Sequence, residues 1–139
     1  MDWQYILQAI LYEEEVTCRA STTIEPWLDV QDDETVALVF AALEILRNQG
    51  PALGRPLVDT VSGSELKNMK ELRPASSGRS EVCILFAFDP RREAIMLLAG
   101  DKSKGKNSKA KWSGWYKKAI PEAERIFAEH LRNKEQGNA

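Results

Sequence analysis

Histidine and cysteine are the scarcest reactive residues in this sequence: there is one histidine, His130, and two cysteines, Cys18 and Cys83. A zinc site of the usual His and Cys type therefore lacks ligands. A Ser-His-acid triad would have to use His130, and no nucleophile-elbow motif accompanies it. We interpret His130 as a residue near a helix end that helps to cap it. Two distant cysteines without C-x-x-C spacing indicate a reduced, cytoplasmic compartment.

Phosphate loops, long apolar runs and targeting signals are also missing. Gly100 and Gly105 flank lysines but do not form G-x-x-x-x-G-K-[ST], so nucleotide-driven chemistry has no support. The longest apolar run, in the 36–46 region, is too short to cross a bilayer. An acid at position 2 and a glutamate cluster at 13–15 leave no readable targeting segment. We expect no cofactor, no metal and no membrane partner.

Basic residues are nearly absent from the first 50 positions, where Arg19 and Arg47 face ten acids and the net charge is −8. Residues 51–120 carry fourteen basic and seven acidic residues, or +7, and the remainder carries three against four, or −1, which sums to −2. Such segregation permits a positive field on one face. The same counts also fit charged side chains that are scattered over the solvated surface and differ between segments only by chance. Charge counts alone favour that second interpretation.

The first half of the chain has helical character. Apolar residues at helical spacing predict an amphipathic helix over 3–13, and β-branched residues predict a strand over 16–20. A capping box, T-x-x-E at 22–25, predicts a short helix start. Asp32 or Asp33 caps the next helix, which is nearly all apolar over 36–46 and should be largely buried before it ends at Gly50.

The second half predicts a small sheet and one more helix. Proline and glycine between 51 and 64 indicate an irregular connection. Strands are expected at 69–73, 82–88 and 94–99, the last two as a hairpin, with a turn at 75–78. A final helix should run from Trp112 or Trp115 to about His130. The predicted fold is α+β: N-terminal helices, a small mostly antiparallel β-sheet and a C-terminal helix, in one domain over 1–139 with a frayed tail at 134–139.

Cations gather around the predicted sheet. Residues 101–118 contain seven lysines, two tryptophans and one tyrosine but only one acid. Further basic residues lie along the strand at 69–73 and its turn, or just after the strand at 94–99: Lys67, Lys70, Arg73, Arg79 and Lys102. Arginine and lysine bind phosphate oxygens, so convergence of these residues would suit an RNA backbone.

The aromatic residues in the same stretch have two interpretations. Trp112, Trp115 and Tyr116 could stack unpaired bases or pack the last helix onto the sheet. We favour packing for Trp115, and for Tyr116 the two interpretations are level. Arg73 could likewise pair with Glu71 or Glu81 instead of phosphate, because ion-pair networks resemble functional sites.

An ordered set of motifs resembles a known family. It comprises LGRP at 53–56, NMKELRP at 68–74, ILFAFDP at 84–90, LAGDKS at 98–103 and WY at 115–116. The set resembles the phage-derived, HigB-like branch of the RelE/ParE toxins of type II toxin–antitoxin systems, from about Trp27 to Leu131. Against that pattern, residues 104–111 look like a Lys-rich loop insertion and residues 1–14 like an atypical N-terminal helical extension.

The resemblance implies a RelE-like α+β toxin with a sheet like that of microbial ribonucleases. It implies a metal-independent endoribonuclease that cuts mRNA, often on the ribosome, and is silenced by a cognate antitoxin, here expected to be of helix-turn-helix type. Cleavage needs a base, positive charge at the phosphate and an acid. We assign Lys70 as base, Arg73 and Arg79 to the transition-state charge, and Lys102 or Tyr116 as acid.

The predicted RNA contacts lie outside that catalytic set: Lys67, Lys104, Lys106, Lys109, Lys111 and Trp112. The alternative function is a non-catalytic RelE/ParE-like protein that binds RNA or a protein target such as a topoisomerase. Cys83 favours this alternative, because relatives often carry arginine at that strand position.

Overall fold

The computed structural model describes residues 15–75, 81–101 and 108–135, with the backbone alone described at 108–113 and 135. At its centre is a five-stranded sheet in the order β1-β5-β4-β3-β2. The strands are β1 (Cys18–Ala20), β2 (Val58–Thr60), β3 (Lys70–Leu72), β4 (Val82–Phe88) and β5 (Ala94–Asp101). β1 runs parallel to β5, and the other neighbouring pairs are antiparallel. The predicted α+β class and mostly antiparallel sheet are confirmed.

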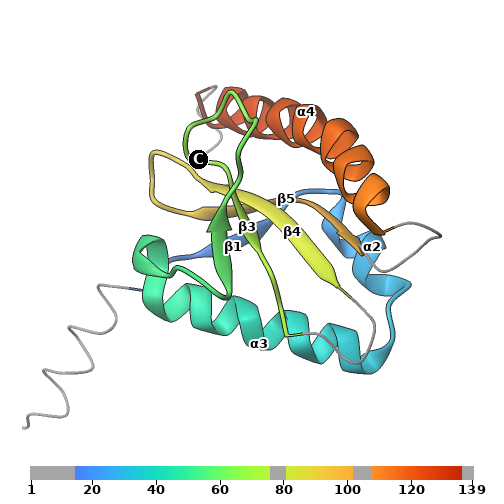
Figure 1. The fold of residues 1–139 in the computed structure, drawn as a ribbon. Helices are drawn as coiled ribbons and strands as arrows, with labels where there is room; N and C mark the ends of the chain where they lie inside the picture. The colour runs from blue at the N-terminus through green and yellow to red at the C-terminus, as the bar shows by residue number, and fades with distance from the viewer. Residues whose placement is uncertain (1–14, 76–80, 102–107, 136–139) are drawn as a thin grey trace, which may run out of the picture.

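Helices cover both faces of this sheet (Figure 1). α2 (Ile24–Asp29), α3 (Asp33–Gln49) and the 3-10 turn η1 (Gly50–Ala52) precede β2, and α4 (Ser108–Glu135) ends the described chain. α4 lies on one face and α3 on the other. Because both faces are covered, β4 is buried from Val82 to Ala87, as its uninterrupted apolar sequence predicts.

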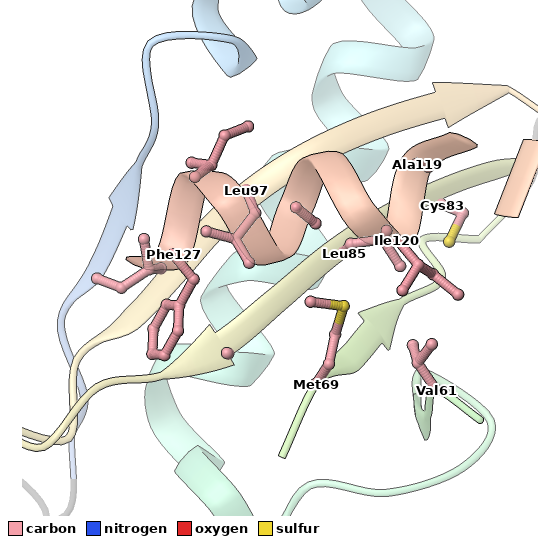
Figure 2. Packing of buried hydrophobic residues seen from close by; sticks show 12 residues of the cluster. Val61, Met69, Cys83, Leu85, Leu97, Ala119, Ile120 and Phe127 are labelled. Atoms are coloured by element: carbon pink, nitrogen blue, oxygen red, sulfur yellow. The ribbon is translucent and has the colours of Figure 1, made fainter. Parts of the chain in front are cut away.

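Side chains of β3, β4 and β5 alternate between two apolar clusters. Figure 2 shows the α4 side, where Cys83, Leu85 and Leu97 meet Ile120 and Phe127 of the helix. The α3 side contains other residues of the same strands, among them Leu72, Ile84, Phe86 and Met96, packed with Leu46 of α3. The alternation therefore determines which polar side chains of the strands point to the α4 side of the sheet.

Three expectations about the first half need correction or addition. α2 forms, but the capping box does not: Thr23 is the N-cap and makes no side-chain cap bond. Its hydroxyl donates instead to the Leu97 carbonyl at 2.7 Å, as does Ser21 at 2.8 Å, because β1 ends there and leaves that carbonyl without a strand partner. β2 forms inside the segment expected to be irregular.

The burial of α3 is the third difference. Asp32 caps the helix as predicted, accepting from the Thr35 N–H at 2.7 Å. Only one stripe of the helix is buried, however, and Phe40 and Ile45 are exposed by 57% and 41%. The expectation of a largely buried helix is wrong because the sheet covers only one side of α3.

Other boundaries differ by a few residues. β1, β3, β4 and β5 form at the predicted strands, and β4 and β5 make the predicted hairpin, with a register shift between Leu85 and Phe86. α4 begins at residue 108 and ends at 135, so it includes residues 108–111 of the expected loop and the start of the expected frayed tail. The predicted helix at 3–13 and most of the turn at 75–78 lie outside the described residues.

Asp89, in the turn between β4 and β5, holds the end of α4 against the sheet. Its buried carboxylate accepts from the backbone N–H groups of Arg91 and Glu93 at 3.0 and 2.9 Å. Its other oxygen lies 3.0 Å from both His130 Nε2 and Lys134 Nζ. His130 thus bonds across to the hairpin rather than capping its own helix, because α4 continues past it.

Asp89→Asn should destabilise the fold in a pH-dependent way. Burial raises the pKa of Asp89, but hydrogen bonds from His130, the Glu93 amide and Lys134 outweigh it and lower the pKa to about 2. A depressed pKa stabilises the fold above the unfolded value of 3.8, and this stabilisation disappears as pH falls through about 2. The variant should therefore lose up to about 2 kcal/mol near pH 7 and little near pH 2, as measured by urea denaturation.

Glu122→Gln provides the matched control, because it removes an exposed carboxylate that pairs with Arg125 on the same helix. It should leave the urea midpoint unchanged. If Asp89→Asn lowers the free energy of unfolding equally at pH 7 and pH 2, the charge of the carboxylate contributes nothing to stability.

Gly100 in β5 allows the start of α4 to approach the sheet. A Cβ built at position 100 would lie 2.4 Å from the Nε1 atom of Trp115, far inside van der Waals contact. Trp115 is half-buried against the α4-side cluster, so the packing interpretation of this residue is confirmed. Its ring meets that of Tyr116 edge-on, with centroids 5.1 Å apart. The glycine thus helps to set the position of the neighbouring tyrosine.

Gly100→Ala should displace Trp115 and lower the melting temperature by several degrees, since overpacking costs about 1–3 kcal/mol. Near-ultraviolet circular dichroism should change as the Trp115–Tyr116 pair moves. Gly54→Ala is the control, because nothing lies within 4 Å of a Cβ at that position. A variant at position 100 that melts like the parent would mean that Trp115 moves aside without cost.

Candidate functional site

Glu71 occupies the middle of β3 and points to the α4 side of the sheet. β3 pairs with β2 on one side and with β4 on the other, opposing Glu71 to Asp59 and Leu85. Its neighbours on the strand, Lys70 and Leu72, point to the α3 side because strand side chains alternate. Glu71 is only 3% exposed, an unusual degree of burial for a carboxylate.

Four donor atoms surround this carboxylate. Oε1 accepts from Arg73 Nε at 2.9 Å and also from Arg73 Nη2. Oε2 accepts from Cys83 Sγ at 3.1 Å and from the Tyr116 hydroxyl. Burial raises the pKa of Glu71, but the bonds from Tyr116, Cys83 and Arg73 outweigh it and hold the pKa below its ordinary value. Glu71 is therefore an ionised, fully bonded carboxylate at neutral pH.

Tyr116 reaches Glu71 from the first turns of α4. Burial, followed by the hydrogen bond to Glu71, raises the pKa of its phenol far above the ordinary value. Tyr116 thus remains a neutral donor whose proton points at the carboxylate. A phenol oxygen can accept a hydrogen bond as well as donate one.

Arg73 follows β3 and bridges two acids at the protein surface. Besides Glu71, its Nη2 atom lies 3.4 Å from Asp59 Oδ2 in β2. Asp59 also pairs with Arg55, at 3.2 Å. The Arg73 side chain remains 42% exposed, so a ligand can reach the guanidinium. The alternative pairing of Arg73 with Glu71 is confirmed.

A surface pocket of about 970 Å³ opens over this network. Its lining includes Glu71, Arg73 and Tyr116, together with Arg55, Asp59 and Lys117. The wall formed by the segment before β3 is tied to α4, because Glu124 Oε2 accepts from Ser64 Oγ at 2.9 Å and from the Glu65 amide at 2.6 Å. A cation, Arg73, and a phenol, Tyr116, are thus among the groups that line a pocket open to solvent.

Of the residues predicted from the sequence, the structure brings Arg73 and Tyr116 together. Lys70 lies on the α3 side, where its Nζ atom donates to the Pro51 carbonyl at 3.3 Å and sits 5.8 Å from the Phe88 ring centroid. Lys67 is exposed in the segment before β3. The other predicted residues lie outside the described residues or have only their backbone described: Arg79, Lys102, Lys104, Lys106, Lys109, Lys111 and Trp112.

Sequence reasoning named Glu71 only as a possible ion-pair partner of Arg73 and Cys83 only as a departure from the family pattern, and it did not name Asp59. A usable signal was present, since an acid lies between Met69 and Leu72 in a predicted strand and must face either solvent or a partner. Within the described ranges, no three His, Cys, Asp or Glu side chains lie close enough to hold a metal ion. No helix in that part of the chain is long and apolar enough to span a membrane.

Comparison with known proteins places these residues in a family. A profile described as "Phage derived protein Gp49-like (DUF891)" matches residues 26–128. Two proteins of Mycobacterium tuberculosis are similar to this chain. "Putative toxin HigB2" is 60% identical over 108 residues, which is 78% of this chain and 51% of that protein. "Putative toxin HigB3" is 41% identical over 114 residues, which is 82% of this chain and 92% of that protein.

The extents of these matches are unequal. This chain spans about half the length of HigB2 and nearly all of HigB3. The family profile covers well over half of the chain and includes Glu71, Arg73 and Tyr116. The resemblance inferred from the LGRP to WY motifs is thereby confirmed, and the chain belongs to the phage-derived Gp49-like family, with HigB-like toxins among its relatives.

Proposed function

We propose that this chain is the toxin of a type II toxin–antitoxin system and acts as a metal-independent endoribonuclease on mRNA, in the cytoplasm and on the ribosome. The observation that carries the proposal is the meeting of Arg73 and Tyr116 on Glu71 at the base of an open pocket. The similarity to two HigB proteins described as toxins supports it. A helix-turn-helix antitoxin is the proposed partner.

The proposed reaction is attack of a ribose 2′-hydroxyl on the adjacent phosphorus. The O–P bond that forms gives a 2′,3′-cyclic phosphate, and the bond to the 5′-oxygen breaks. Tyr116 accepts the 2′-hydroxyl proton as it passes its own proton to Glu71, so the phenol need not ionise. Arg73 stabilises the charge on the phosphate oxygens. Lys102, which follows β5, remains the proposed acid for the departing 5′-oxygen.

The proposed base differs from Lys70, the base predicted from the sequence. Lys70 lies on the opposite side of the sheet from the pocket, with its ammonium group at the Pro51 carbonyl. Glu71 is ionised and already hydrogen-bonded to the phenol, so the pair supplies a proton acceptor without Lys70. Lys67 and the lysines of 104–111 remain proposed contacts to the RNA backbone.

A second function has one structural observation in its favour. Arg73 is ion-paired to two acids, and the same pocket contains Arg55, which also pairs with Asp59. Cations neutralised in this way bind phosphate less strongly than free ones. This favours a non-catalytic member that binds RNA or a protein target such as a topoisomerase.

The two functions separate in a translation extract that contains one defined message. The purified chain should cut the message and leave 2′,3′-cyclic phosphate ends. Binding without cleavage would favour the RNA-binding alternative, and neither binding nor cleavage would favour a protein target. In a bacterium, expression should stop translation, and a small helix-turn-helix gene adjacent to this one should relieve the arrest.

A further inference from the structure

Beside its buried stripe, α3 presents a second apolar stripe that the described residues cover only in part. The buried stripe of this helix contains Val39, Ala42 and Leu46. A second stripe at helical spacing runs through Val36, Phe40 and Leu43, and Phe40 is 57% exposed. A single exposed apolar side chain is common, but here the partly exposed Val36 and Leu43 extend the apolar surface around Phe40.

Phe40 and Leu43 form one wall of a groove of about 570 Å³, which we call the α3 groove. The opposite wall is the first described segment, residues 15–18, and Glu44 and Arg47 complete the lining. The Val16 N–H donates to the Arg47 carbonyl at 2.9 Å, which fixes this segment to the last turns of α3. The chain therefore enters the described fold at the edge of the groove.

The sequence immediately before that entry point is suited to the groove. Residues 3–13 carry apolar side chains at helical spacing on one side of the predicted helix, while Tyr5 and Tyr12 lie on the opposite side. Eleven helical residues extend about 16 Å, and Phe40 lies about 10 Å along α3 from Arg47. A covalently attached segment of this length has a high effective concentration at the groove.

We propose that the apolar side of residues 3–13 packs in the α3 groove against Phe40 and Leu43, as an intramolecular cover. Electrostatics near the entry point agree with this, because Arg47 lies close enough to Glu15 for their charges to interact favourably. The competing occupants are a second copy of the chain and a separate protein. The proposal does not depend on nuclease activity.

Cys18 supplies a natural probe of the cover. It lines the groove and is half-buried, whereas Cys83 is fully buried in the sheet. Alkylation of the native full-length chain by iodoacetamide, followed by mass spectrometry, gives both rates in one sample. The Cys18 rate reports access to the groove, and the Cys83 rate reports global unfolding.

The decisive comparison uses two charge-matched double variants of the full chain. Leu7→Asp with Ile10→Asp places carboxylates on the apolar side and should accelerate Cys18 alkylation about tenfold or more, the change that ~1.4 kcal/mol of docking free energy gives. Tyr5→Asp with Tyr12→Asp adds the same charge to the opposite side and should leave the rate unchanged. The parent rate should not depend on protein concentration.

Two results would overturn the proposal. Equal Cys18 rates in the parent and both variants would mean that residues 3–13 do not cover the groove and would favour a separate protein. A parent rate that rises on dilution would show that a second copy covers it. If the aspartate pair also exposes Cys83, the pair Leu7→Ala with Ile10→Ala repeats the test against Tyr5→Ala with Tyr12→Ala.

Discussion

Replacing Arg73 by alanine should slow RNA cleavage by on the order of a hundredfold or more, as loss of a donor to a charged transition state does. The Arg73 side chain is 42% exposed, and its guanidinium donates to the same carboxylate, Glu71, as the Tyr116 hydroxyl. The measurement is the single-turnover cleavage rate of a defined message, with a thermal melt of each variant beside it.

Stability has to be separated from chemistry in this experiment. An isolated exposed cation could be removed at little cost, but Arg73 provides two of the donor atoms on a buried carboxylate. Arg73→Lys keeps the charge and loses the two-pronged geometry, so it should melt closer to the parent and still cleave more slowly.

Arg55→Ala is the matched control for position 73. Arg55 lines the same pocket and pairs with the same Asp59, but its side chain is 79% exposed, and in the described structure its ion pair is with Asp59 rather than Glu71. It should cleave at nearly the parent rate. An Arg73→Ala protein that melts normally and cuts as fast as the parent would remove Arg73 from the site.

Replacing Tyr116 by phenylalanine should reduce cleavage by roughly a hundredfold to ten-thousandfold, the usual contribution of a positioned proton-transfer group. The change removes one oxygen atom and retains the ring that packs against Trp115. The fold keeps its aromatic contact but loses a donor to the buried Glu71 carboxylate, so the melting temperature should fall as well. The cleavage rate at pH 7 is therefore compared at a temperature where both proteins are folded.

The same substitution should also move the acid limb of the pH–rate profile. The hydrogen bond from Tyr116 is the largest of the interactions that lower the pKa of Glu71. Without it the pKa of Glu71 rises, and the carboxylate is protonated at higher pH. The acid limb of the variant should therefore lie at higher pH than that of the parent, if Glu71 must be ionised to accept the proton.

Cys83→Ser tests whether the effect is specific to the phenol. Serine keeps a donor at the position from which Cys83 Sγ contacts Glu71, so both the rate and the acid limb should stay near the parent values. If Tyr116→Phe lowers the rate but leaves the acid limb in place, the proton does not pass to Glu71.

Much of the fold was predictable from local pattern. The continuous apolar run at 82–88 gave the central strand, and an aspartate ahead of an apolar segment gave the start of α3. The motifs from LGRP to WY led to the correct family because each is contiguous in sequence. β2 was missed because three residues between turns have no periodicity of their own, and it forms only by pairing with β3.

The candidate site was only half predictable. Arg73 and Tyr116 could be named from their chemistry. The faces to which Lys70 and Glu71 point could not be predicted, because strand alternation shows only that adjacent side chains point to opposite faces. The pairing of β3 between β2 and β4 decides which of the two faces α4. The contact between Glu71 and Tyr116 spans 45 residues and depends on how closely α4 approaches the sheet at Gly100.

The sequence by itself thus determined the order of most elements, the family, and the presence of cationic side chains and a tyrosine for the candidate site. The tertiary structure decided that Lys70 and Glu71 lie on opposite sides of the sheet and that a buried carboxylate gathers Arg73, Cys83 and Tyr116. The physical reason is that burial and hydrogen bonding of Glu71 depend on strand register and helix packing, which involve residues far apart in the chain.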